Sequence, residues 1–122
     1  MHSPLKSLLV GSCREDLKSS PKDVRLFMGS ALYLAQDGGT HPDARPLRGF
    51  GSVGVLEGVD DFDGDTYRAV YSVKLQGVVF ALHAFQKKSR TGKKTPQQDL
   101  ELVRRRLRRA EAIHAEIVRR CP

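Results

Sequence analysis

Residues 65–85, which read DTYRAVYSVKLQGVVFALHAF, decide the fold of this 122-residue chain. In residues 65–75 the side chains alternate, which is typical of a β-strand with two different faces. One face carries Tyr67, Ala69, Tyr71, Val73 and Leu75, and the other carries Thr66, Arg68, Val70, Ser72 and Lys74. Residues 77–85 are apolar on both faces, as expected of a central strand. With Gln76-Gly77 between them at a turn position, the two runs predict an antiparallel hairpin at the centre of a sheet.

Further strands are predicted on either side of this hairpin. Residues 53–59 (VGVLEGV) form the preceding strand, and Asp63-Gly64 connects it to the hairpin, since Asp-Gly is a strong turn signal. Residues 7–10 form a short first strand. The Pro/Gly-rich segment 40–54 is expected to be a connector without strands of its own.

Three helices complete the prediction. Ser12 and Glu15 have the spacing of a capping box, which favours a short helix ending near Ser19. A second helix follows from Ser20 as N-cap and Pro21 at the first helical position, with apolar residues repeating at three- and four-residue steps as far as Ala35. Thr95, Pro96 and Gln98 start the third helix in the same way.

The element order is therefore β-α-α-β-β-β-α in a single domain spanning residues 1–122. It predicts an α+β fold with a mainly antiparallel four-stranded sheet, an N-terminal helical hairpin and a C-terminal helix.

The net charge of +7 is concentrated in the last third of the chain. Residues 1–85 contain nine Lys/Arg and ten Asp/Glu, whereas residues 86–122 contain the remaining twelve Lys/Arg and four Asp/Glu. Such an asymmetry indicates an acidic partner for the C-terminal region.

Several classes of protein are disfavoured by the sequence. Cys13 and Cys121 stand alone, so no disulfide framework is expected and a reducing cytoplasm is the expected location. The apolar run 8–10 is too short for a secretory leader, and no run is long enough to span a membrane. The acidic segment 60–65 lacks the Gly and Glu positions of a calcium loop, and the four histidines lack metal-ligand spacing. No metal or cofactor is expected.

Arg68 and His83 are the polar residues of interest on the strands. Arg68 either pairs across the sheet with Glu57 or, held rigidly on the strand, binds a phosphate through two hydrogen bonds. His83 is either a packed strand residue or a proton-transfer group beside the basic segment that follows.

Two other segments concentrate positive charge. Residues 84–98 (AFQKKSRTGKKTPQQ) contain five cations and no acid. The C-terminal helix carries five arginines off or beside its apolar stripe, at positions 104, 105, 106, 108 and 109. They form either a solvated face or a contact surface for nucleic acid or an acidic protein.

The order of these motifs resembles the RelE/HigB superfamily of type II toxins, in particular the phage-derived, host-inhibition HigB-like branch. The similarity covers nearly the whole chain. The residues that carry it are Tyr67-Arg68, the run from Leu82 and His83 to Phe85, Lys87 and Lys88, Thr95-Pro96, the PLRGFG segment at 46–51, and Leu56-Glu57.

The resemblance implies a ribosome-dependent, metal-independent endoribonuclease that cleaves mRNA, inhibits translation and is neutralised by a helix-turn-helix antitoxin. By similarity, Arg68 with Lys87 or Lys88 stabilises the phosphate, and His83 is a weaker candidate for proton transfer. The same resemblance assigns RNA contacts to Arg48, Arg90, Lys93 and Lys94.

One position departs from the pattern. Many relatives carry a basic residue directly after the Leu-Glu pair, where this chain has Gly58. Two alternatives stay open: a toxin of the same fold that binds a protein target such as gyrase without cutting RNA, and a non-catalytic nucleic-acid-binding module.

Overall fold

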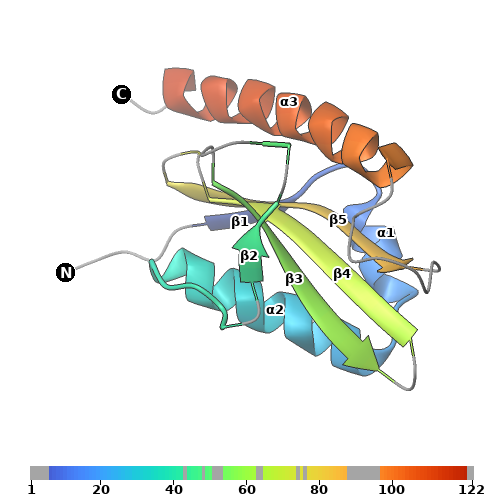
Figure 1. The fold of residues 1–122 in the computed structure, drawn as a ribbon. Coiled ribbons are helices and arrows are strands. Elements are labelled where there is room, and N and C mark those ends of the chain that lie inside the picture. Colours follow the sequence, from blue (N-terminus) through green and yellow to red (C-terminus); the bar gives the residue numbers. More distant parts are fainter. Residues whose placement is uncertain are drawn as a thin grey trace.

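The computed structural model describes residues 6–42, 44–47, 49–50, 54–62, 65–73, 75, 77–87 and 97–120. They form a five-stranded sheet in the order β1-β5-β4-β3-β2, with three helices (Figure 1). The elements are β1 Lys6–Leu9, α1 Cys13–Lys18, α2 Lys22–Gln36, β2 Ala44–Pro46, β3 Val55–Phe62, β4 Asp65–Ser72, β5 Val78–Lys87 and α3 Gln97–Arg120.

The predicted α+β class and mainly antiparallel sheet are confirmed, but the strand count of four is wrong. The segment expected to be a connector contributes β2, which pairs antiparallel with β3 through Arg45 and Glu57. Pro46 is compatible with this strand because β2 lies at the sheet edge, where a missing N–H breaks no inner ladder. Among the strands of the described residues, β1 alone has a parallel partner, β5.

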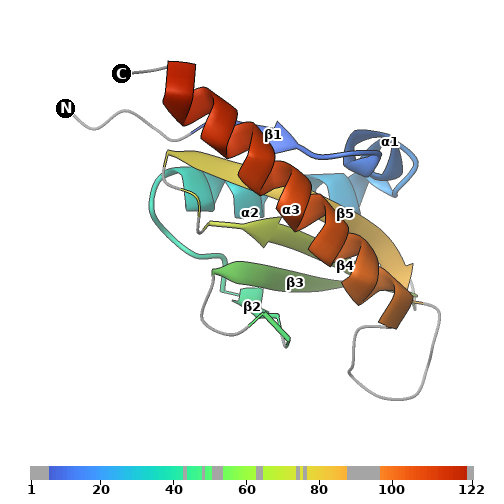
Figure 2. The ribbon, with the colours of Figure 1, turned by 90° about the horizontal axis from the view of Figure 1, so that it is seen from above.

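The sheet separates two apolar cores. On one face α2 packs through Met28, Ala31, Leu32 and Ala35, and α1 adds Cys13. On the other face α3 packs through Val103, Leu107 and Ala110. Figures 1 and 2 show α2 and α3 on opposite sides of the sheet, with α1 at one end of β5. The helices therefore cover both faces, and the N-terminal pair is on a different side from α3.

The predicted alternation along β4 is confirmed. Ala69 and Tyr71 belong to the α2 face, while Val70 belongs to the α3 face. Arg68 shares the parity of Val70, and its partner Glu57 lies on the same face, opposite Val70 in the register. A charged pair thus lies on the sheet surface that α3 covers.

A β-bulge interrupts the pairing of β4 with β5. Val70 pairs with His83 and Tyr71 pairs with Ala81, so Leu82 is an extra residue on β5. A bulge of this kind places two consecutive side chains on one face. Leu82 belongs to the α3 core, and His83, opposite Val70, also lies on the α3 face.

The predicted helix starts are only partly realised. Ser12 precedes α1, but its side chain makes no capping hydrogen bond and instead donates to the Asp16 carboxylate. Pro21 occupies the N-cap position of α2, one residue outside the predicted place. Thr95 and Pro96 lie outside the described residues.

Candidate functional site

Arg68 is held on β4 by an acidic neighbour. Its Nη1 donates to Glu57 Oε1 over 2.8 Å, and the two side chains are only 6% and 12% exposed. The burial of both partners fixes the guanidinium on the sheet. The pairing of Arg68 with Glu57 that the sequence suggested is present, and it anchors a cation beside the end of β5.

His83 lies next to Arg68 on the same face, with its ring stacked on Phe85 at a centroid distance of 4.5 Å. Phe85 pairs directly with Arg68 across the strands. Asp99, in the first turn of α3, lies 2.8 Å from His83 Nε2 through its Oδ1. The histidine is 7% exposed, so it is a buried link between β5 and the start of α3.

The environment of His83 favours the neutral form of the imidazole. Burial lowers its pKa below the ordinary value, although the hydrogen bond to Asp99 opposes this effect and Arg106 assists it. The 2.8 Å contact with Asp99 favours the charged ring, but burial is the larger effect and keeps the pKa of His83 below its ordinary value, which favours the uncharged ring at neutral pH. Because the Arg106 guanidinium, which can only donate, lies 3.4 Å from Nδ1, the proton is assigned to Nε2, which donates to Asp99.

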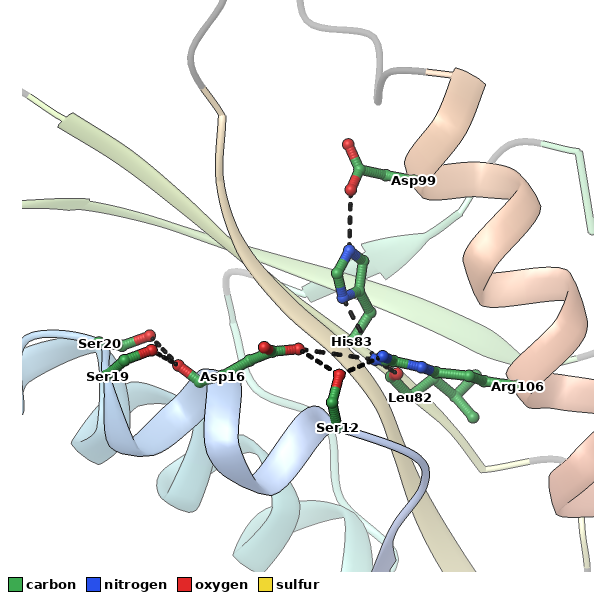
Figure 3. A network of polar contacts seen from close by, with 8 residues as sticks. All are labelled: Ser12, Asp16, Ser19, Ser20, Leu82, His83, Asp99 and Arg106. Atoms are coloured by element: carbon green, nitrogen blue, oxygen red, sulfur yellow. Dashed lines mark hydrogen bonds and ion pairs between the residues drawn. The ribbon is translucent and has the colours of Figure 1, made fainter.

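Arg106 connects three elements (Figure 3). Its Nη1 donates to the carbonyl of Leu82 over 2.8 Å, and its Nη2 donates to Ser12 Oγ over 2.6 Å. Asp16 lies 3.8 Å from Nη1 and accepts a hydrogen bond from Ser12. Since Leu82 is the extra residue of the bulge, Arg106 satisfies a carbonyl at the irregular point of the ladder.

Gly11 makes room for this arginine. Its φ is +62°, in the left-handed region, and a Cβ atom there would lie 2.9 Å from Arg106 Nε. A side chain at this position would therefore be strained and would also push the guanidinium away. The turn from β1 to α1 is thus shaped around Arg106.

The predicted site residues are only partly described. Arg68 and His83 lie on adjacent strands, and the backbone of Lys87 pairs with Thr66 at the end of the same ladder. The side chain of Lys87 lies outside the described part of the structure, as do Lys88 and the predicted RNA contacts Arg48, Arg90, Lys93 and Lys94. Their proposed roles stay predictions.

Gly58, where a basic residue was expected by resemblance, faces the opposite side of the sheet. It pairs with Ala69 of the α2 core, and a Cβ atom there would lie 2.7 Å from the Phe27 ring. Phe27 therefore fills the space that a side chain at position 58 would need. A cation at this position would be on the face opposite Arg68.

The sequence reasoning missed the Arg106 network. Arg106 was grouped with four other arginines, although it borders the stripe formed by Val103, Leu107 and Ala110. The sequence pattern gave Ser12 the role of a helix cap and did not single out Asp99. The helical position of Arg106 beside the stripe was the available signal, but the bulge that supplies its acceptor leaves no distinct pattern in the sequence.

Other kinds of site are not formed by the described residues. Among them, no group of three or more His, Cys, Asp or Glu residues is placed to hold a metal ion. Burial raises the pKa of Cys13 to about 12, so its thiol is protonated at neutral pH and is a poor nucleophile. Within the same residues, no helix is long and apolar enough to cross a membrane.

Comparison with known proteins gives one match. Residues 15–108 match the family described as Phage derived protein Gp49-like (DUF891), which covers more than half of the chain and every element from α1 to the middle of α3. Neither a curated protein nor a solved structure matches. Membership of this family is consistent with a role as the toxin of a toxin–antitoxin system. The chain is a member of the phage-derived Gp49-like family.

Proposed function

We propose that this protein is the toxin of a type II toxin–antitoxin pair and acts as a ribosome-dependent, metal-independent mRNA endoribonuclease. Its neutralising partner is a helix-turn-helix antitoxin. Membership of the Gp49-like family supports the toxin assignment, and the resemblance to the RelE/HigB superfamily supports the reaction.

The observation that carries the proposal is the register of β4 and β5. Arg68 is opposite Phe85 and Thr66 is opposite Lys87, so the candidate cations occupy neighbouring positions at one end of two paired strands. Arg68 is buried and fixed by Glu57, which limits the reorganisation needed when a charged group binds.

The reaction requires little from the protein beyond fixed charge and proton transfer. The 2′-oxygen of the RNA bonds to the adjacent phosphorus, and the bond from phosphorus to the 5′-oxygen breaks. The 2′-proton passes to a base, and the departing 5′-oxygen gains a proton. Arg68 with Lys87 or Lys88 stabilises the negative charge on the phosphoryl oxygens, while Arg48, Arg90, Lys93 and Lys94 hold the strand.

In the observed arrangement, His83 holds neighbouring residues in position. Its Nε2 donates to Asp99 and its Nδ1 faces Arg106, so both ring nitrogens are engaged. Its stacking on Phe85 holds the residue opposite Arg68. We assign His83 a positioning role, which becomes proton acceptance only when Nδ1 is released from Arg106.

The same contacts favour an alternative, a toxin that inhibits growth by binding a protein such as gyrase. Arg68 is already neutralised by Glu57, and His83 has no ring nitrogen available for a substrate. In this alternative the end of β4 and β5 is a binding surface and mRNA remains intact.

The experiment is induced expression followed by primer-extension mapping of cellular mRNA. Arg68→Lys keeps the charge but loses the planar guanidinium, so we expect cleavage to fall by about 100-fold or more. Arg120→Lys is the matched control, because Arg120 is exposed at the last turn of α3, 21 residues beyond Asp99, which contacts His83. Growth arrest by the wild-type protein with intact transcripts would exclude the nuclease and favour the alternative.

A further inference from the structure

Three exposed arginines of α3 lie away from both the core and the Arg106 network. Arg105, Arg108 and Arg109 are spaced by three and four residues, so they share the outward face of the helix. Figure 2 shows α3 crossing over the sheet, with this length of the helix on the outside of the molecule. They form a compact group of guanidinium groups, which we call the arginine face.

The arginines elsewhere on α3 are occupied within the protein. Arg106 bonds to Leu82 and Ser12, and Arg104 stacks over the Phe50 ring at 5.3 Å. At the end of the helix, Arg119 and Arg120 both pair with Glu116. By contrast, none of the three residues of the arginine face has a hydrogen bond or ion pair within the described part of the chain.

The surroundings of the arginine face favour a polyanion over a folded protein. Protein interfaces have an apolar centre, but the described α3 exposes one large apolar residue, Val118, more than two turns beyond Arg109. Two acids border this part of the helix surface, Glu101 four residues before Arg105 and Glu111 three residues after Arg108, so the three arginines keep a net positive charge. Charge without apolar area is what contact with a phosphate backbone requires.

The position of the arginine face relates it to the proposed cleavage site. Asp99, which contacts His83, precedes Arg105 by six residues, or about 9 Å along the helix axis at a rise of about 1.5 Å per residue. α3 therefore begins at the proposed cleavage site, and the arginine face starts less than two turns further along the same helix.

We propose that the arginine face binds the phosphate backbone of RNA and holds the strand independently of the cleavage residues. This inference rests on the proposed action on RNA. It assigns to α3 a contact that is electrostatic and independent of base sequence, so it contributes affinity while the residues on β4 and β5 carry out the reaction.

The test measures binding to a short 2′-O-methyl RNA, which has no free 2′-hydroxyl and is not cleaved. The affinity is measured between about 50 and 200 mM salt for the wild-type protein and for the triple variant Arg105→Gln, Arg108→Gln, Arg109→Gln. Each phosphate contact contributes about 0.7 to the slope of log affinity against log salt for a single strand, so three contacts contribute roughly 2. The triple variant should lose that part of the slope.

The matched control is Arg119→Gln, Arg120→Gln, which removes charge from the same helix at residues already paired with Glu116. We expect this variant to keep most of the wild-type slope, and thermal melting checks that both variants are folded. An unchanged slope in the triple variant overturns the inference, and so does an equal loss per charge in both variants, which would mean that binding follows net charge alone.

A protein partner is tested with poly-L-glutamate under the same conditions. Arg109 also borders an open hollow of about 320 Å³ with Ala112 and Ile113, which is the observation most favourable to a protein. Loss of poly-L-glutamate binding with an unchanged RNA slope would assign the face to an acidic protein and overturn the inference. Because this RNA cannot be cleaved, the binding test does not depend on nuclease activity. If the triple variant loses slope but the wild-type protein cleaves no mRNA in cells, the proposed nuclease activity is refuted and the proposed RNA contact of the arginine face stands.

Discussion

The two faces of the sheet are built by different means. On the α2 face, Met28, Ala31 and Leu32 meet Ala69 and Tyr71 in an apolar core. On the α3 face, an apolar core is continued by the buried Arg68 and His83 and the half-buried Arg106. Burying a polar or charged group costs free energy unless the group finds a partner. An apolar core would therefore stabilise this face of the sheet without such groups. The polar groups of the α3 face are therefore the candidates for function, whereas the described α2 face is mainly apolar core.

The largest effect on stability is expected from Arg106. Arg106→Met keeps the length of the side chain but leaves the Leu82 carbonyl and Ser12 without their donor, which should cost about 2–3 kcal/mol of unfolding free energy. Urea unfolding monitored by circular dichroism measures the loss.

The matched change on the apolar face is Met28→Leu. It conserves volume in a core without buried charge, so it should cost less than about 1.5 kcal/mol. Equal costs for Arg106→Met and Met28→Leu would mean that the polar network contributes no more than ordinary packing.

A smaller effect on stability is expected from substitutions at two glycines. Gly11→Ala places a Cβ atom 2.9 Å from Arg106 Nε in a backbone with φ of +62°, and should destabilise the protein by about 1–3 kcal/mol. Gly29→Ala is the control, because the α2 position has no atom within 4 Å of the added Cβ and an ordinary φ. It should stabilise the protein by about 0.5–1 kcal/mol. Changes of the same sign in the two melting temperatures would contradict the role assigned to Gly11.

The smallest effect is a pH dependence. Because burial lowers the pKa of His83, the unfolded chain takes up a proton at a higher pH than the folded protein does. The stability linked to this residue is therefore fully present above a pH of about 6.5 and is lost as the pH falls toward the lowered pKa of the folded state. The melting temperature of the wild-type protein should drop more between neutral pH and mild acid than that of His83→Gln. Parallel pH curves for the two proteins would show that His83 does not titrate on unfolding.

The alternation of residues 65–75 and the double-sided apolar run 77–85 were sufficient to predict the central hairpin, because local periodicity reports which faces are buried. The edge strand β2 was missed because three residues with a proline resemble a connector, and its pairing with β3 is a tertiary contact. The pair of Arg68 with Glu57 was predictable from strand spacing. The contact of Arg106 with Leu82 was not, because it joins residues 24 positions apart through a bulge.

The bulge at Leu82 makes the count of residues in β5 part of the site. Deleting this residue would restore a regular ladder with Ala81 and would keep every other amino acid. The residues beyond it would then alternate in step with residues 78–81, so His83 and Phe85 would keep their partners and their face. The loss would be the Leu82 side chain from the α3 core and the carbonyl that accepts a hydrogen bond from Arg106. A chain that lacked this one residue would therefore keep the strand register and lose the backbone acceptor that ties α3 to the sheet.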